Sequence, residues 1–431
     1  MRGLSLVVMM AGAGIAPLRA QQPDTAMVTL QVSLDEAVQR ALDVQPAMVQ
    51  AEGVTRNAGA ARRTSFGSFL PQLSFNGSAS LNSQGRIDQN SRNVIPPIWN
   101  YGSGLSASLD LFTGLRRIWT LRSATADLSA ADAGLVTQRY QTVLQTKQAF
   151  YNALATEELV GVADAQVRRA QLQLEVSVQK LHAGSATRSD SLRAAVDYGN
   201  ARIAVLQAQS NLATAQANLG RQIGVDQPVR AVPDSQLPPV PDTTTLRRMV
   251  VDSAPQVAQA DAQARAAQAN VWSNRSQYIP SLRLTYGLNG RDTIFSNLLV
   301  ANRTHNWQFS LSWTLFNGFA REQSQVSADV QRDNAQAQAA DTRRLVRAQL
   351  TQQIAALETA YAQIDIATVN VAAATEDLRV QQERYRVGAG TILDLLTSQS
   401  ALTQAQTNLV QTRFNYLIAR AQLEALVGHS L

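Results

Sequence analysis

Leu111-Phe112-Thr113-Gly114 and Leu315-Phe316-Asn317-Gly318 lie 204 positions apart, and this recurrence decides how the chain is organised. The same offset relates other pairs: Gly184 with Gly388, Asp190 with Asp394, and Ile223-Gly224 with Val427-Gly428. Upstream the offset becomes 209, which relates Pro46 to Pro255 and Pro71 to Pro280. A register held over such a length is typical of an internal duplication. We therefore expect two structural repeats, 33–224 and 246–428, joined by a Pro-rich linker over 225–245.

Four segments alternate apolar and polar residues with a period of two, at about 72–82, 103–112, 281–290 and 306–315. Alternating segments of about ten residues are typical of strands with one face toward lipid and the other toward a lumen. A strand of an ordinary soluble sheet is nearer five or six residues. Trp307 and Trp313 in the last segment are candidates for an aromatic girdle at a membrane interface.

Proline-free stretches with helical character follow each pair of strands, at about 116–182 and 320–386. Helices of this length would span roughly 100 Å and would need coiled-coil-like packing. Shorter helices are expected before the strands, at about 34–67 and 246–277, and after the long helices, at about 189–223 and 392–427. No segment has 18 consecutive apolar residues, so the sequence predicts no transmembrane helix. Entry into a membrane would require strands that close a barrel.

Four strands are too few to close a transmembrane barrel, whose minimum is about eight. Several chains would therefore have to share one barrel. Two chains would give eight strands around a packed interior, and three would give twelve strands around a water-filled lumen. The polar strand faces, which are mainly Ser, Thr, Asn and Gln, favour the lumen and hence three chains.

Composition excludes several kinds of site. The 431 residues include no Cys, which excludes disulfides and thiol chemistry, and only three dispersed His, so we expect no metal site and no cofactor. The formal charge of +6 is spread without a basic run, which argues against nucleic-acid binding. Arg2 followed by the apolar stretch Leu4–Ile15 is typical of a signal peptide over 1–20, with cleavage after Ala20.

Longer motifs carry a family resemblance. Phe69-Leu70-Pro71 and Tyr278-Ile279-Pro280 precede strands, Leu-Phe-x-Gly follows them, and Tyr385-Arg-Val-Gly-Ala-Gly-Thr-Ile-Leu-Asp-Leu-Leu396 occupies the second helix–helix turn. Over about 33–428 the chain resembles the TolC-like outer membrane efflux protein family. The resemblance implies a mainly α fold with β strands, in which a homotrimer joins a twelve-stranded barrel in outer membrane lipid to a periplasmic α-helical tunnel. It also implies a passive exit duct for efflux or type I secretion. A periplasmic adaptor protein would couple this duct to an inner-membrane transporter of the RND or ABC type.

The aspartates at the two helix–helix turns, Asp190 and Asp394, have two possible roles. Thr187-x-x-Asp190 and Thr391-x-x-Asp394 match the capping box, in which an acid and a hydroxyl satisfy the first amides of a helix. If both turns line the closed end of a tunnel, the same aspartates would form rings around the axis of a trimer and attract cations. The two roles are compatible.

The resemblance also assigns a periplasmic gate. Family gate positions fall on Tyr385, Gly390, Ser189 and Asp190, so the tyrosine is present but an arginine is replaced by glycine. A further family acid falls on Thr397. We therefore expect a different latch, through Arg188 or Arg386. The expected adaptor-docking residues, which could instead merely shape the turns, are Ala183, Gly184, Ser191, Val387, Gly388 and Leu395.

The residues argue against two other classes of function. A periplasmic coiled-coil scaffold without a pore would explain the helices but not the four alternating strands. An enzyme with paired carboxylates is not expected, because the adjacent acids Glu157-Glu158 and Asp35-Glu36 diverge by about 100° on a helix. The sequence does not identify the cargo.

Overall fold

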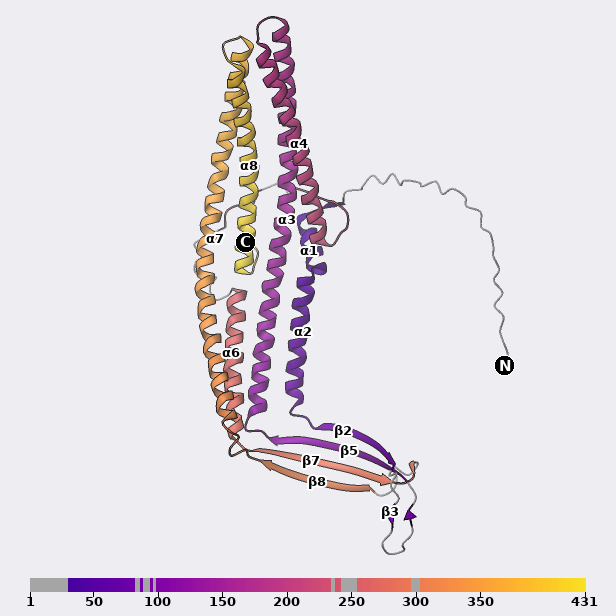
Figure 1. Ribbon diagram of the computed structural model, residues 1–431. Helices are drawn as coiled ribbons and strands as arrows, with labels where there is room; N and C mark the ends of the chain where they lie inside the picture. Colours follow the sequence, from indigo (N-terminus) through magenta and orange to yellow (C-terminus); the bar gives the residue numbers. More distant parts are fainter. Residues whose placement is uncertain are drawn as a thin grey trace, which may run out of the picture.

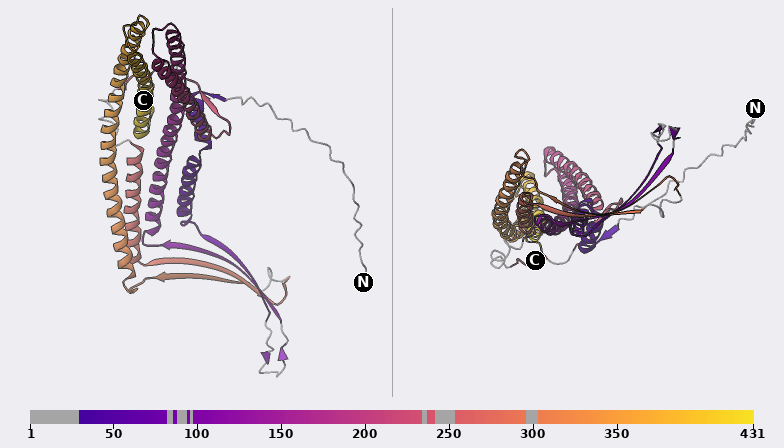
Figure 2. Two further views of the ribbon diagram at one scale, coloured as in Figure 1. Left: turned by 45° about the horizontal axis from the view of Figure 1, so that its top comes forward. Right: turned by 90° about the horizontal axis from the view of Figure 1, so that it is seen from below.

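The computed structural model describes residues 30–81, 86–87, 94–95, 98–233, 237–241, 254–295 and 303–431. The predicted signal peptide lies outside these residues. Figure 1 shows a long column of helices with a sheet at one end, and Figure 2 shows that the sheet extends to one side of the column.

Two helices of 67 residues form the length of the column, α3 (Arg116–His182) and α7 (Ala320–Arg386), and their bounds coincide with the predicted long helices. Each turns at the end far from the sheet into an antiparallel partner, α4 (Arg188–Ile223) or α8 (Ile392–Val427). Within the described residues, none of these helices is apolar enough over a sufficient length to cross a membrane.

The lower half of each long helix has a second neighbour. It is α2 (Pro46–Gly67) beside α3, and α6 (Pro255–Arg275), followed by the 3-10 turn η1 (Ser276–Tyr278), beside α7. The predicted helix 34–67 is interrupted at Gln45, which separates α1 (Leu34–Val44) from α2. Gln45 is extended (φ −64°, ψ 126°) because a residue before proline is disfavoured in the helical region. Residues 246–253 of the other predicted helix lie outside the described part.

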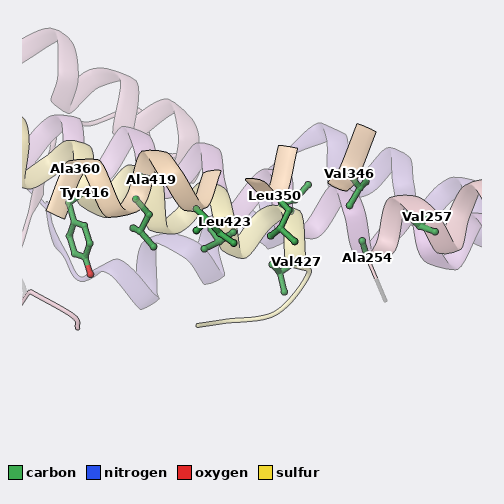
Figure 3. Packing of buried hydrophobic residues seen from close by; sticks show 12 residues of the cluster. Ala254, Val257, Val346, Leu350, Ala360, Tyr416, Ala419, Leu423 and Val427 are labelled. Atoms are coloured by element: carbon green, nitrogen blue, oxygen red, sulfur yellow. The ribbon is translucent and has the colours of Figure 1, made fainter. Parts of the chain in front are cut away.

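The core of the second repeat forms where α8 ends and α6 begins, both against α7. Figure 3 shows this cluster, in which Ala254 and Val257 approach Leu350 and Val346, and Leu423 and Val427 follow on the side of α8. Two shorter helices thus pack end to end along each long helix, α4 and α2 along α3, and α8 and α6 along α7. This arrangement buries apolar side chains along the length of the column.

The sheet contains four antiparallel strands in the order β2-β5-β7-β8: β2 (Gln72–Leu81), β5 (Trp99–Phe112), β7 (Ser281–Asp292) and β8 (Arg303–Ser312). The predicted second and third strands are too short, because the pairing of β5 with β7 continues to Tyr101 and Asp292. The predicted fourth strand is displaced, since its pairing with β7 begins at Arg303 and ends at Ser312. A short ribbon, β3 (Arg86–Ile87) with β4 (Val94–Ile95), lies in the loop between β2 and β5.

A second small sheet lies beside the upper half of the column and was not predicted. β1 (Leu30–Val32) pairs in parallel with β6 (Val229–Ala231), inside the predicted linker. Three residues are too few to display an alternating pattern. Further along the linker, the carbonyl of Pro238 accepts a hydrogen bond of 2.8 Å from the Tyr416 hydroxyl on α8, so this part of the linker is held against the helices.

Candidate functional site

Strand register places the apolar residues of all four strands on one face of the sheet. Leu105 pairs with Phe75 on one side and with Leu288 on the other, and Tyr286 pairs with Trp307. These side chains are not covered within the chain, since Phe75 is 65% exposed and Trp307 is 64% exposed. A continuous exposed apolar face of this kind indicates contact with a membrane or a protein.

The opposite face of the sheet is polar. The hydroxyls of Ser74 and Ser106 lie 2.6 Å apart across β2 and β5, and Asp110 forms an ion pair of 2.6 Å with Arg283 across β5 and β7. The two outer strands, β2 and β8, each pair on one side only within the described residues. Their free edges carry backbone groups that need partners.

The proposed girdle residues lie at different depths on the sheet. Trp307, within β8, packs its ring 4.6 Å from that of Tyr286. Trp313 lies just beyond the end of β8, where its indole Nε1 donates a 3.2 Å hydrogen bond to the carbonyl of Tyr278. Both side chains are more than half exposed, as membrane-interface aromatics would be.

At the far end of the column, the two turns between long helices share one hydrogen-bond pattern. Gly184 (φ +70°) and Gly388 (φ +80°) each follow the end of a long helix in the left-handed conformation that favours glycine. The amide of Ser185 donates a hydrogen bond to the carbonyl of Lys180, and the amide of Ala389 donates to the carbonyl of Arg384. These bonds satisfy a free carbonyl at each helix end.

Both predicted capping boxes are present at the start of α4 and α8. The Thr187 amide donates to the Asp190 carboxylate at 3.0 Å and the Thr391 amide to that of Asp394 at 3.1 Å. Hydrogen bonds from the Thr391 hydroxyl and then its amide lower the pKa of Asp394 below its ordinary value, because they stabilise the ionised form. The capping role of the two acids is thus confirmed.

Tyr385, the tyrosine expected at the gate, forms no hydrogen bond within the chain with Ser189 or Asp190, the polar positions that the resemblance assigned to it. Tyr385 is buried at the end of α7, where its hydroxyl lies 3.5 Å from that of Ser177. The ammonium of Lys180 lies 4.2 Å from the Tyr385 ring centroid and donates a hydrogen bond to the Tyr385 carbonyl. Its polar partners therefore lie on α3, whereas Ser189 and Asp190 lie in the first turn of α4.

The expected latch residues have only local contacts within the chain, and their gating role stays a prediction. Arg386 forms an ion pair of 2.8 Å with Glu383 of its own helix, with both side chains largely exposed, and so it does not link the two turns within the chain. Thr397 donates its hydroxyl to the Leu393 carbonyl at 2.8 Å, again within one helix. Arg188 is the exposed first residue of α4. Lys180 was missed by sequence reasoning.

The expected docking residues separate into two groups. Val387 is 66% exposed, Ala183, Gly184 and Gly388 are also exposed, and Ser191 is partly buried. Leu395 is 1% exposed and packs in a core cluster with Ile392 and Leu402. Its side chain is therefore turned into the bundle in this arrangement of the chain, and its docking role stays a prediction.

Lysine usage could have revealed the missed residue. The chain has only two lysines, Lys147 and Lys180, among its 38 basic residues. Both lie on α3 and both contact a helix of the second repeat, because Lys147 forms an ion pair with Glu424 on α8. A compact ammonium fits between closely packed helices where a guanidinium fork would need more space.

No group of three or more His, Cys, Asp or Glu side chains able to hold a metal ion is found in the described part of the chain.

Comparison with known proteins agrees with this architecture. The family model described as "Outer membrane efflux protein" matches residues 34–225 and 246–429. Protein CyaE of Bordetella pertussis is 27% identical over 334 residues, which cover 73% of this chain and 66% of that protein. The toluene efflux pump outer membrane protein TtgC of Pseudomonas putida is 24% identical, with coverage of 83% and 75%. The alkaline protease secretion protein AprF of Pseudomonas aeruginosa is 22% identical, with coverage of 76% and 70%.

Solved structures show the same fold. The outer membrane protein VceC of Vibrio cholerae superimposes with a TM-score of 0.80 at 18% identity, covering 92% of this chain and 96% of that one. The match over nearly all of the chain means that the helical column and the sheet correspond together. The chain therefore belongs to the outer membrane efflux protein family, whose members are non-enzymatic transport proteins of the outer membrane.

Proposed function

We propose that three copies of this chain form one outer membrane channel, in which each copy contributes four strands to a shared twelve-stranded barrel. The observation that carries the proposal is the sheet itself, with one exposed apolar face, one polar face and two free edges. Free edges in lipid are costly, and four strands cannot close a barrel alone. Twelve strands would enclose a water-filled lumen lined by the polar face.

The helices of the three copies would continue this lumen as a periplasmic tunnel, with its closed end at the two helix–helix turns. Asp190 and Asp394 would then each occur three times around the axis, and the rings would attract cations. The contact of Lys180 with Tyr385 holds the end of α7 against α3 and would favour the closed arrangement.

The channel would act as the passive exit duct of an efflux or type I secretion system. A periplasmic adaptor would bind the turns at Ala183, Gly184, Ser191, Val387 and Gly388, and an inner-membrane transporter of the RND or ABC type would supply the energy. The names of TtgC and AprF refer to toluene efflux and protease secretion respectively, so membership of the family supports both classes of cargo.

Ion conductance in planar lipid bilayers tests the channel directly. Purified protein should form trimers by native mass spectrometry and produce discrete conductance steps. Leu105→Asp, which places a charge in the apolar face of central strand β5, should abolish the steps. Helical trimers that never conduct would reject the channel and favour a periplasmic scaffold.

A further inference from the structure

The two junctions between strand and long helix share an unusual backbone conformation. Leu115, which follows Gly114, has φ +66°, and Phe319, which follows Gly318, has φ +65°. Within the described residues they are the only residues other than glycine with positive φ. Bulky side chains rarely adopt this region, and such strain persists only where something else maintains it.

The same two residues break two further rules. Each is the N-cap of a long helix, yet its side chain makes no capping hydrogen bond. This position ordinarily selects Ser, Thr, Asp or Asn. Moreover, Leu115 is 51% exposed and Phe319 is 68% exposed, and the ring that Phe319 contacts, Phe316, is itself 71% exposed, so neither side chain is buried in a core of the chain. A large apolar side chain in a strained, uncapped and exposed position points to a ligand outside the chain.

Arginine contacts hold both junctions in place. Arg117 donates to the carbonyl of Leu111 at 3.3 Å, and Arg321 donates to that of Leu315 at 2.9 Å. The guanidinium of Arg117 also lies over the Phe69 ring, as that of Arg321 lies over the Tyr278 ring. The same contacts occur in both repeats. The arginines therefore hold the backbone of both junctions in the conformation that leaves Leu115 and Phe319 exposed.

We propose that Leu115 and Phe319 insert into the phospholipid boundary at the periplasmic end of the sheet. The exposed apolar face of β8 continues past the end of the strand toward Phe319, through Leu315 and Phe316, each 71% exposed. The Phe316 and Phe319 rings lie 5.4 Å apart at 90°. Apolar side chains at such a boundary, beside arginines, match the composition of interfacial anchors.

A second copy of the chain would not explain both junctions. Phe319 follows β8, an outer strand of the sheet, whereas Leu115 follows β5, which pairs with strands on both sides. A neighbouring copy that adds to an edge of the sheet would lie beside only one of them. Lipid surrounds a barrel evenly, so it can cover an equivalent residue after an outer strand and after an inner one.

The absence of cysteine permits a direct test. Leu115→Cys, Phe319→Cys and, as the control, Ala183→Cys at the far turn are labelled with an NBD fluorophore. The proteins are reconstituted in phosphatidylethanolamine and phosphatidylglycerol vesicles with nitroxide lipids. We expect a headgroup-level nitroxide to quench positions 115 and 319 more than a chain-end nitroxide does, and to leave position 183 unchanged. Quenching by aqueous iodide alone would overturn the proposal, as would protection from both quenchers, which indicates cover by another copy.

Circular dichroism identifies any variant that fails to fold, and Phe316→Cys then tests the same surface. The inference rests in part on the proposed channel, so conductance is measured on the same preparations. Conductance without lipid quenching rejects the inserted side chains alone. Lipid quenching without conductance supports the inserted side chains and rejects the channel.

Discussion

Lys180 of α3 contacts both the ring and the carbonyl of Tyr385 in the last turn of α7. Its ammonium lies 4.2 Å from the ring centroid and donates to the Tyr385 carbonyl. That carbonyl lies at the C-terminus of a helix, where the helix dipole favours a cation. Lys180 of the first repeat thus contacts the end of α7 in the second repeat. The sequence led us to expect a latch through Arg188 or Arg386 instead.

Replacing this lysine should loosen the turn. In Lys180→Met, loss of a charge-assisted hydrogen bond and a cation–π contact should weaken the closed arrangement by roughly 1–2 kcal/mol. We expect more frequent or larger openings in planar bilayers. Arg379→Ala on the same helix is the matched control, because its exposed ion pair with Glu376 contributes little. Equal conductance of Lys180→Met and the parent protein would show that the contact does not restrain the channel.

Lys147, the other lysine, should contribute to the free energy of unfolding. Glu424 is 7% exposed, and its partner Lys147 joins α3 to α8. Lys147→Met leaves the Glu424 carboxylate with Arg420 at 3.5 Å and the Leu431 amide at 3.4 Å, so we expect the free energy of unfolding to fall by about 2–4 kcal/mol. The double variant Lys147→Met/Glu424→Gln should recover part of this loss in thermal denaturation followed by circular dichroism. A double variant less stable than Lys147→Met would contradict the charge-burial explanation.

The duplicated junctions offer a matched glycine pair. Gly114 and Gly318 have φ of +60° and +67°, so alanine should cost about 1–2 kcal/mol at either. At Gly114 alone, a Cβ would also lie 2.8 Å from the Ser276 carbonyl oxygen and from Cβ of Ile279. Gly114→Ala should therefore lower the thermal midpoint more than Gly318→Ala. The reverse order would mean that the contact with η1 is not tight.

The capping box of α8 should be acid-sensitive. The pKa of Asp394 is lowered in the folded protein by its bonds to Thr391, so its contribution is complete above the ordinary value of 3.8. That contribution is lost as pH falls through the lower folded value. The protection factors of the amides at residues 391–395, which compare each exchange rate with that of the unfolded chain at the same pH, should fall over this range. Asp394→Asn should exchange faster at neutral pH and lose this acid dependence, whereas Asp341→Asn on the surface of α7 should behave as the parent does.

Cross-linking from exposed and buried positions near the second helix–helix turn should distinguish residues that bind the adaptor from residues of the core. Val387→Cys, at a 66% exposed position, should form disulfide or maleimide cross-links to the adaptor in the native envelope, whereas Leu395→Cys should not. Glutamate at Gly388 is a poorer probe, because φ of +80° would strain the turn itself. Strong cross-linking from Leu395 would mean that the helices separate on docking.

The sequence by itself determined the elements that local rules govern. The 67-residue helices follow from proline-free periodicity, and the two aspartate caps follow from hydroxyl and acid spacing. The four strands follow from alternation, although their ends depend on pairing with neighbours. The pairing of β1 with β6 could not be predicted, because a strand of three residues is too short to show an alternation of apolar and polar residues.

Only the tertiary structure decided which faces meet. Leu395 and Val387 are both apolar and eight residues apart, yet one is buried and the other exposed. Leu395 lies on the side of α8 that packs against α7, whereas Val387 lies at the C-cap of α7. The partner of Tyr385 is Lys180, 205 residues away in sequence, since the repeats lie side by side. Contacts between distant segments depend on the relative rotation and register of packed helices, which short-range spacing does not encode.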